Sequence, residues 1–157
     1  MPVSKDEFRT ALGCFASGVT VVTTVCPDNK PGGITVSAFT SVSLEPPLVL
    51  VCIDKRASVH DSLTEGKHFA VNILAEDQEH LSRLFASKEQ DRFSRAPYQP
   101  GVTGAPVLHG AAASLECRVV SAYPGGDHTI IVGEVESTAV ADRRPLAYHR
   151  GGYARLI

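Results

Sequence analysis

The sequence predicts a mainly β protein, an antiparallel barrel with three short helices inserted early in the chain. Six or seven segments rich in β-branched and aromatic residues are separated by turn clusters of Gly and Pro, as in barrels. These segments do not alternate regularly with helices, and both the G-x-G-x-x-G fingerprint and the P-loop are missing, which disfavours a Rossmann domain. The 157 residues, 43% of them hydrophobic, fit a single domain over 1–157.

The chain begins with a predicted helix and a predicted strand. Ser4 and Glu7 have the spacing of a capping box, and the helix places three apolar side chains on one face: Phe8, Leu12 and Phe15. The β-branched run 19–25 predicts a strand, because stiff branched side chains fit a pleated surface. A turn cluster at 27–33 then leads into a returning strand over 34–39.

The middle of the chain mixes strands and helices. The apolar run 48–53 is too short for a helix and predicts a buried strand. Residues 58–63 predict a short helix capped by Ser58. A strand is expected over 69–74, and an amphipathic helix over 75–85.

The last third returns to strands. Residues 87–106 first lose all periodicity and are rich in Gly and Pro, which we interpret as a functional loop. Strands over 111–120 and 129–141 then flank a turn at 123–128. A final strand is expected near 152–157.

Charge and composition exclude several classes of partner. Lys and Arg total 15 against 17 Asp and Glu, a net charge of -2, so we expect no nucleic-acid partner. The longest apolar run, 48–53, is far below the ~20 residues of a membrane helix, and the start of the chain lacks the apolar core of a secretory signal. We therefore expect a cytoplasmic protein without a membrane partner. The cysteines and histidines have no metal-ligand spacing, so no metal site is expected.

The most unusual segment is 35–43, which carries five hydroxyl side chains in nine residues. In a continuous strand, Thr35, Ser37 and Phe39 would share one face. Such a face suits a flat heteroaromatic ligand with a polyol or phosphate tail, because hydroxyls bind oxygens while Phe39 closes an apolar side. The alternative is a solvated edge strand whose hydroxyls bond to the backbone.

A candidate anion site directly follows the apolar run. Arg56, Lys55 and Ser58 lie there beside the free N–H groups of a helix start, where phosphates often bind. A capped helix with solvated charges is the alternative. Arg92 and Phe93 offer a second cation and an aromatic ring, unless they belong to an exposed polar loop.

The remaining candidates lie on turns. His128 follows a glycine-containing hairpin turn, where it either contacts a ligand ring or is solvated. Tyr148, Arg150 and Tyr153 surround two glycines and either line the same site or pack the final strand. A nucleophile elbow of the G-x-S-x-G type is missing.

Taken in order, these segments resemble the flavin reductase-like, FMN-binding split-barrel family, which includes the small reductase components of two-component flavin monooxygenases. The resemblance spans nearly the whole chain and rests on an ordered set of short motifs: Gly18-Val-Thr-Val-Val-Thr-Thr24, Thr35-Val-Ser-Ala-Phe39, Ser41-Val-Ser43, Pro46-Pro-Leu-Val-Leu-Val-Cys-Ile53, Phe69-Ala-Val-Asn-Ile-Leu74, Leu81-Ser-x-x-Phe-Ala86, Arg92-Phe93, Leu115-Glu-Cys117, Gly126-Asp-His128 and Gly152-Tyr153. It implies a homodimer of six-stranded antiparallel Greek-key split barrels, with a few short peripheral helices and a flavin near the subunit interface.

The resemblance also implies where the cofactors bind. It assigns the ribityl chain and the polar edge of the flavin ring to one segment: Thr35, Val36, Ser37, Ala38, Phe39, Thr40 and Ser41. The phosphate is assigned to a second, with Arg56 as its main cation: Asp54, Lys55, Arg56, Ala57 and Ser58. Phe85 and Arg92 are expected to approach the flavin, and the nicotinamide is assigned to His128, Arg150 and Tyr153.

The implied activity is that of an NAD(P)H-dependent flavin reductase that passes reduced flavin to a partner flavin-dependent monooxygenase. Hydride moves directly from NADH or NADPH to FMN or FAD, so we name no catalytic side chain. Two alternatives stay open: a flavoprotein with tightly held FMN that reduces another acceptor, and a flavin-binding module without turnover. The residues do not decide between FMN and FAD, or between NADH and NADPH.

Overall fold

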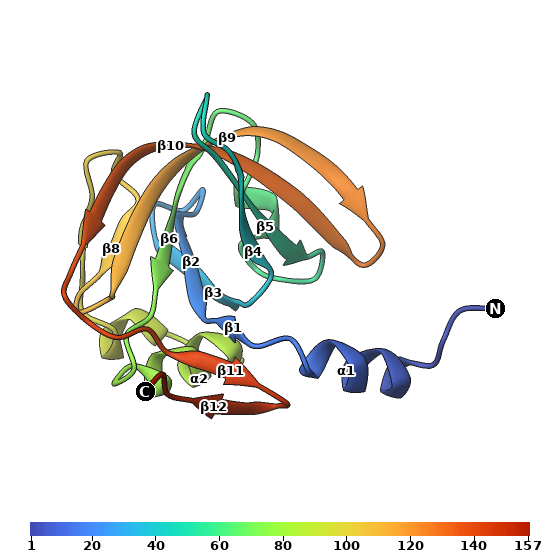
Figure 1. Ribbon diagram of the computed structural model, residues 1–157. Helices are drawn as coiled ribbons and strands as arrows, with labels where there is room; N and C mark the ends of the chain where they lie inside the picture. Colours follow the sequence, from blue (N-terminus) through green and yellow to red (C-terminus); the bar gives the residue numbers. More distant parts are fainter.

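The computed structural model describes residues 1–157 and is built around one seven-stranded antiparallel sheet that curls into a barrel (Figure 1). Along the sheet the strands follow one order: β3 (Pro31–Val36), β2 (Thr20–Val25), β6 (His68–Ile73), β9 (Ala113–Gly125), β10 (His128–Val140), β5 (Leu48–Asp54) and β4 (Phe39–Ser43). Strands β5 and β6 are consecutive in the chain, but the β9–β10 hairpin lies between them, which is a Greek-key arrangement. The predicted mainly β antiparallel fold is confirmed.

The two edge strands of this sheet are neighbours in sequence. Only Ser37 and Ala38 separate β3 from β4, and the Cys52 N–H of β5 donates to the Ala38 carbonyl at 3.0 Å. The sheet therefore closes on itself, with β3 and β4 as two halves of one barrel strand. The single strand predicted over 34–39 is wrong, because the chain turns a corner at Ser37 and Ala38 to move from pairing with β2 to pairing with β5. Thr35, Ser37 and Phe39 therefore do not share one face of a continuous strand.

An aliphatic core fills the barrel. It combines Val22, Val51, Phe69 and Ile131, each at most 1% exposed, with buried side chains from β3, β9 and the segment that follows β5. The buried strand predicted over 48–53 is present as β5, but its residues alternate between buried and partly exposed, so only one face is buried.

The two α-helices lie outside the barrel. Helix α1 (Lys5–Gly13) has the predicted capping box, in which the Glu7 N–H donates to Ser4 Oγ at 3.2 Å and the Ser4 N–H donates to Glu7 Oε2 at 2.9 Å. Helix α2 (Glu79–Ala86) begins four residues after the predicted start at residue 75. Gln78 explains the delay, because its side chain accepts from the Ala75 N–H and so holds 75–78 in a turn.

The structure differs from the prediction in two regions, residues 58–63 and residues 87–106. The expected helix 58–63 is only a 3₁₀ turn, η1 (His60–Ser62), which follows Val59 without a side-chain cap, so Ser58 is not its N-cap. Residues 87–106 are not a structureless loop: they contain η2 (Arg92–Arg95) and β7 (Tyr98–Pro100), which pairs with β8 (Pro106–Leu108). The Glu116 carboxylate holds the tip of this hairpin by accepting from the N–H groups of Val102 and Thr103 at 3.1 and 2.9 Å.

A small second sheet lies below the barrel in Figure 1, with the order β1 (Ser17–Gly18), β11 (Ala147–His149) and β12 (Gly152–Ala154). Strand β11 was not predicted, and the final strand ends at Ala154 rather than continuing to 157. The Arg150 N–H donates to the Gly13 carbonyl at 2.9 Å and so ties this sheet to α1. Helix α1 itself projects away from the barrel (Figure 1). The chain has no helix with the length and apolar character needed to cross a membrane.

Candidate functional site

A groove of about 1380 Å³ runs between β3, the loop that follows β5 and the segment that follows α2. It gathers seven of the residues assigned from the sequence: Thr35, Asp54, Arg56, Ala57, Ser58, Phe85 and Arg92. Thr35 Oγ1 donates to the Ser82 carbonyl at 2.6 Å, which fixes α2 against β3. Closure of the barrel thus brings three distant segments to one site.

The loop after β5 is organised by an ion pair. Asp54 accepts from the Arg56 backbone N–H at 2.8 Å and from Arg56 Nε and Nη2 at 3.2 and 3.0 Å. The side-chain hydrogen bonds from Arg56, followed by the bond from its backbone, lower the pKa of Asp54 from 3.8 to about 2. The Arg56 side chain is 87% exposed, so it presents a fixed cation at the groove.

Free donors lie beside this cation. The N–H groups of Ser58 and Val59 have no acceptor within the chain, and neither has the Ser58 hydroxyl. His60 holds the following turn in place, since its Nε2 lies 2.8 Å from Thr129 Oγ1 of β10. Backbone N–H groups in a turn, a hydroxyl and an arginine form a donor set suited to a phosphate. The residues present therefore fit the phosphate end of a flavin.

Arg92 lines the groove, but its side-chain N–H groups donate to backbone carbonyls of the protein. Its Nη2 donates to the Gly33 carbonyl at 2.9 Å, and its Nη1 donates to the carbonyls of Phe85 and Ser87 at 3.1 and 3.3 Å. Burial lowers the pKa of this guanidinium. Phe93 packs edge-on against Phe85, with ring centroids 5.0 Å apart. Arg92 therefore positions the walls of the groove.

Several assigned flavin residues lie outside the groove. Val36 is only 5% exposed and belongs to the barrel core, and Lys55 does not line the groove although both its neighbours do. The corner and strand β4 carry the others, away from the groove walls: Ser37, Ala38, Phe39, Thr40 and Ser41. Within one chain, the hydroxyl-rich segment therefore contributes only Thr35.

The three residues assigned to the nicotinamide are not brought together within one chain. His128 opens β10 opposite Asp54, and its Nδ1 lies 2.7 Å from Asp127 Oδ1. Arg150 occupies the turn between β11 and β12 with a φ of 50°. Tyr153 lies 2.7 Å from Ser82 Oγ and lines a separate pocket of about 340 Å³.

Sequence reasoning missed other residues of the groove, notably Lys30, Lys88 and Tyr98. Each lies in a segment that reads as a polar turn or loop, so composition gives no reason to select it. They line one groove because the segment after α2 folds back over β3. No local sequence pattern predicts that tertiary arrangement.

Comparison with known proteins identifies the class. Residues 12–156 match the family model described as "Flavin reductase like domain". The chain therefore belongs to the flavin reductase-like domain family, as the ordered motifs predict, and it is an oxidoreductase of the flavin reductase type. The split-barrel fold implied by that resemblance is confirmed.

Individual relatives cover nearly the whole chain. It is 47% identical to the NADH-dependent flavin reductase of a Rhodococcus species, over 98% of this chain and 88% of the relative. It is 45% identical to the FMN reductase (NADH) SmoA of Agrobacterium fabrum, over 96% and 85%. A solved structure of the Streptomyces globisporus NADH:FAD oxidoreductase SgcE6, in complex with NAD and FAD fragments, matches with a TM-score of 0.93 and 40% identity, over 98% and 93%. By contrast, the chain spans 47% of the length of two longer relatives, from Rhizobium meliloti and Acinetobacter baylyi.

Proposed function

We propose that this chain is an NADH:flavin oxidoreductase that binds the flavin phosphate in the groove and supplies reduced flavin to a monooxygenase component. One observation carries the proposal: the free N–H groups of Ser58 and Val59 follow the exposed cation Arg56 in a loop that lines a groove of about 1380 Å³ with Arg56, Ala57 and Ser58. NADH is the proposed donor because the Rhodococcus, Agrobacterium and Streptomyces relatives are named for it.

The side chains of the groove have binding and positioning tasks. Ser58 and Val59 would donate to the phosphate, while Asp54 keeps Arg56 in place for the same anion. Arg92 fixes the wall that faces β3. A bound flavin supplies the hydride acceptor and the reduced nicotinamide supplies the hydride, so the protein need only hold the two rings together. His128, Arg150 and Tyr153 are proposed to contact the nicotinamide.

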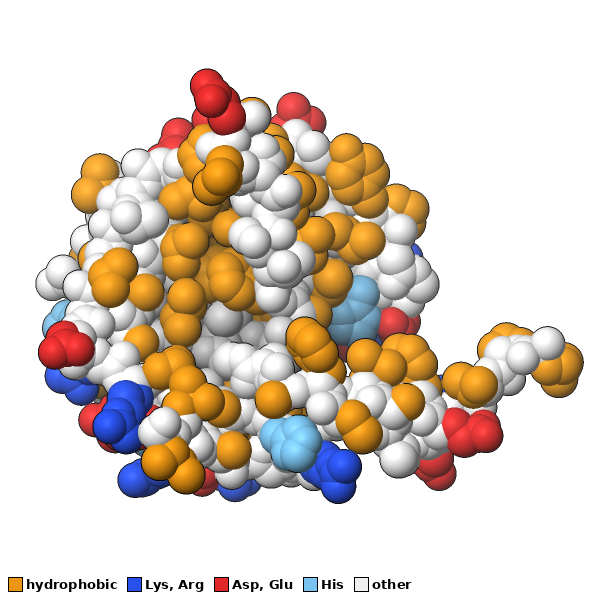
Figure 2. Space-filling view, viewed as in Figure 1, with side chains coloured by type: hydrophobic (Ala, Val, Ile, Leu, Met, Phe, Trp, Pro, Cys, Tyr) orange, Lys and Arg blue, Asp and Glu red, His pale blue; other side chains and the backbone are white.

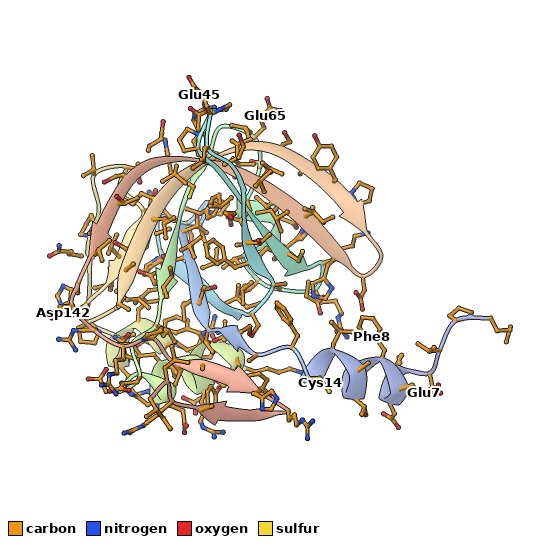
Figure 3. All side chains as sticks on the ribbon, in the orientation of Figure 1. Glu7, Phe8, Cys14, Glu45, Glu65 and Asp142 are labelled. Carbon is orange, nitrogen blue, oxygen red and sulfur yellow. The ribbon has the colours of Figure 1, made fainter.

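A homodimer is part of the proposal. Helix α1 has no buried residue, and three large apolar side chains are exposed at its end of the chain: Phe8 at 57%, Leu12 at 53% and Phe15 at 75%. Figure 2 shows hydrophobic side chains along α1 and over the adjacent face of the barrel, and Figure 3 shows Phe8 on the side of α1 that faces the barrel. Apolar surface of this kind marks an interaction site. A second copy would complete the environment of the corner residues 37–41.

The monooxygenase partner is supported by relatives with that role in their names. The chain is 40% identical to the reductase subunit HsaB of a flavin-dependent monooxygenase from Mycobacterium tuberculosis, over 98% of this chain. A cytoplasmic location is also proposed, and four free cysteines accord with a reducing compartment.

Steady-state oxidation of NADH by the purified protein, with and without added flavin, tests the function. We expect oxidation that saturates as FMN or FAD is added. Flavin that stays with the protein through gel filtration and supports full turnover without addition would favour the alternative of a tightly held prosthetic group. Flavin binding without NADH oxidation would favour a binding module and would refute the proposed enzyme.

A further inference from the structure

The loop after β5, residues 55–59, is fastened at both ends to the hairpin that β9 and β10 form. At the start of the loop, the Lys55 N–H donates to the Asp127 carbonyl in the hairpin turn at 3.0 Å. Just after its end, His60 Nε2 lies 2.8 Å from Thr129 Oγ1 on β10. The two partners on the hairpin are only two residues apart in sequence. The loop therefore starts and ends on the same short piece of the hairpin.

A neighbouring carboxylate orients the imidazole of His60. Its Nδ1 lies 2.8 Å from Asp61 Oδ1. Because a carboxylate accepts hydrogen bonds, Nδ1 carries a proton, and Nε2 of the neutral ring is left to accept from the Thr129 hydroxyl. The His60 side chain is 23% exposed, whereas Asp61 is fully exposed. The contact with Thr129 therefore lies on the more buried side of the ring, where a hydrogen bond is stronger than in water.

The two free donors of the loop come directly before this second attachment. The N–H groups of Ser58 and Val59 have no acceptor within the chain, whereas the next N–H, that of His60, donates to the Ala57 carbonyl at 3.0 Å. The Val59 side chain is 1% exposed and packs in the barrel core. The directions of the two free N–H groups therefore depend on the burial of Val59 and on the bond between His60 and Thr129.

We propose that His60 and Thr129 are positioning residues that hold the free N–H groups of the loop in place for the flavin phosphate, and so determine the preference for a phosphorylated flavin over riboflavin. The inference rests on the proposed function, which takes this loop as the phosphate site. Donors that are already held in place cost less entropy when a ligand binds. Neither His60 nor Thr129 lines the groove, so a substitution at either position removes no group from its wall and acts on the ligand through the loop.

Fluorescence titration with FMN and with riboflavin tests the proposal, because the two ligands share one ring system and differ only in the phosphate. We expect the native protein to bind FMN more tightly than riboflavin. Thr129→Val removes the hydroxyl but keeps a β-branched strand residue, so it should weaken FMN binding about fivefold, as for one lost hydrogen bond, and leave riboflavin binding unchanged. His60→Ala should have the same effect. Thr129→Ser and His60→Gln should restore FMN binding, because each returns a polar group at a similar reach. The control is Thr138→Val, at an exposed threonine farther along β10.

Equal losses of FMN and riboflavin affinity in Thr129→Val and His60→Ala would overturn the proposal, because a general loosening of the fold does not depend on the phosphate. Unchanged FMN affinity in both variants would overturn it as well. Either result leaves the proposed function intact, since the native protein still prefers the phosphorylated flavin. A native protein that binds riboflavin as tightly as FMN would instead remove the phosphate from this loop, and the binding mode in the proposed function would fail together with the inference.

Discussion

The Arg92 guanidinium donates to the Gly33 carbonyl at 2.9 Å, a bond between residues 59 positions apart in sequence. Gly33 belongs to β3 on one wall of the groove, and Arg92 opens η2 on the other. The same side chain also binds the carbonyls of Phe85 and Ser87 at the end of α2. The width of the groove therefore depends on one half-buried cation.

Removing this cation is expected to destabilise the protein and widen the groove. Arg92→Ala would leave three backbone carbonyls without their donor, so the free energy of unfolding should fall by about 1–3 kcal/mol. Arg92→Lys should recover little, because an ammonium group lacks the planar fork. Urea denaturation measures the loss, and flavin titration should show weaker binding. Arg143→Ala, which removes only an exposed ion pair with Asp77, is the control. An Arg92→Ala variant as stable as that control would contradict the role given to Arg92.

The Asp54–Arg56 pair predicts a specific response to acid. Folding lowers the pKa of Asp54 from 3.8 to about 2, so its contribution to stability is present above about pH 4 and is lost as the pH falls toward 2. The urea midpoint of the native protein should therefore decline more steeply across that window than the midpoint of Asp54→Asn. Asp142→Asn, at an exposed carboxylate labelled in Figure 3, should behave like the native protein. If the urea midpoints of the native protein and of Asp54→Asn decline in parallel as the pH falls, the pH-dependent contribution of Asp54 to stability is refuted.

His128 is proposed to contact the nicotinamide, which predicts a kinetic effect of its removal. His128→Ala should raise the apparent KM for NADH about fivefold, the effect of one lost contact, and should raise the KM for flavin less. Steady-state kinetics with each substrate varied in turn separates the two constants. His109→Ala, at an exposed histidine elsewhere, should change neither. An unchanged KM for NADH in His128→Ala would remove the residue from the nicotinamide site.

The exposed face of α1 predicts an oligomeric state. Light scattering after gel filtration should give the mass of a dimer for the native protein and of a monomer for Leu12→Asp or Phe15→Asp, because a charge there would be buried in the interface. Thr10 lies on the opposite side of the helix, so Thr10→Asp should stay dimeric. A monomeric native protein would refute the proposal. A dimer that persists in both apolar-face variants would place the interface elsewhere.

Local patterns predicted the elements that depend on nearby residues. The capping box of Ser4 and Glu7, the β-branched strand β2 and the hairpin β9–β10 all follow from spacing and side-chain shape, and all are present. The hairpin turn is shorter than the predicted 123–128, because pairing continues to Gly125 and His128. Cross-strand pairing of these long strands extends the ladder through residues that read as turn formers.

Elements set by distant contacts were not predictable in the same way. The corner at Ser37 and Ala38 exists because the chain must pair with β2 before it and with β5 after it. Gln78 delays α2 through bonds to Ala75 and to the carbonyl of His109, which is 31 residues away. The groove residues Lys30 and Lys88 likewise line one groove only after the barrel has closed.

Anaerobic mixing of NADH with the protein–flavin complex tests the central claim most directly. The loss of the visible absorbance of oxidised flavin reports reduction without interference from oxygen. A flavin reductase should bleach its flavin far faster than NADH reduces the same concentration of free flavin, and the rate should saturate with NADH. Bleaching no faster than that of free flavin, in a complex shown to be fully formed, would contradict the account.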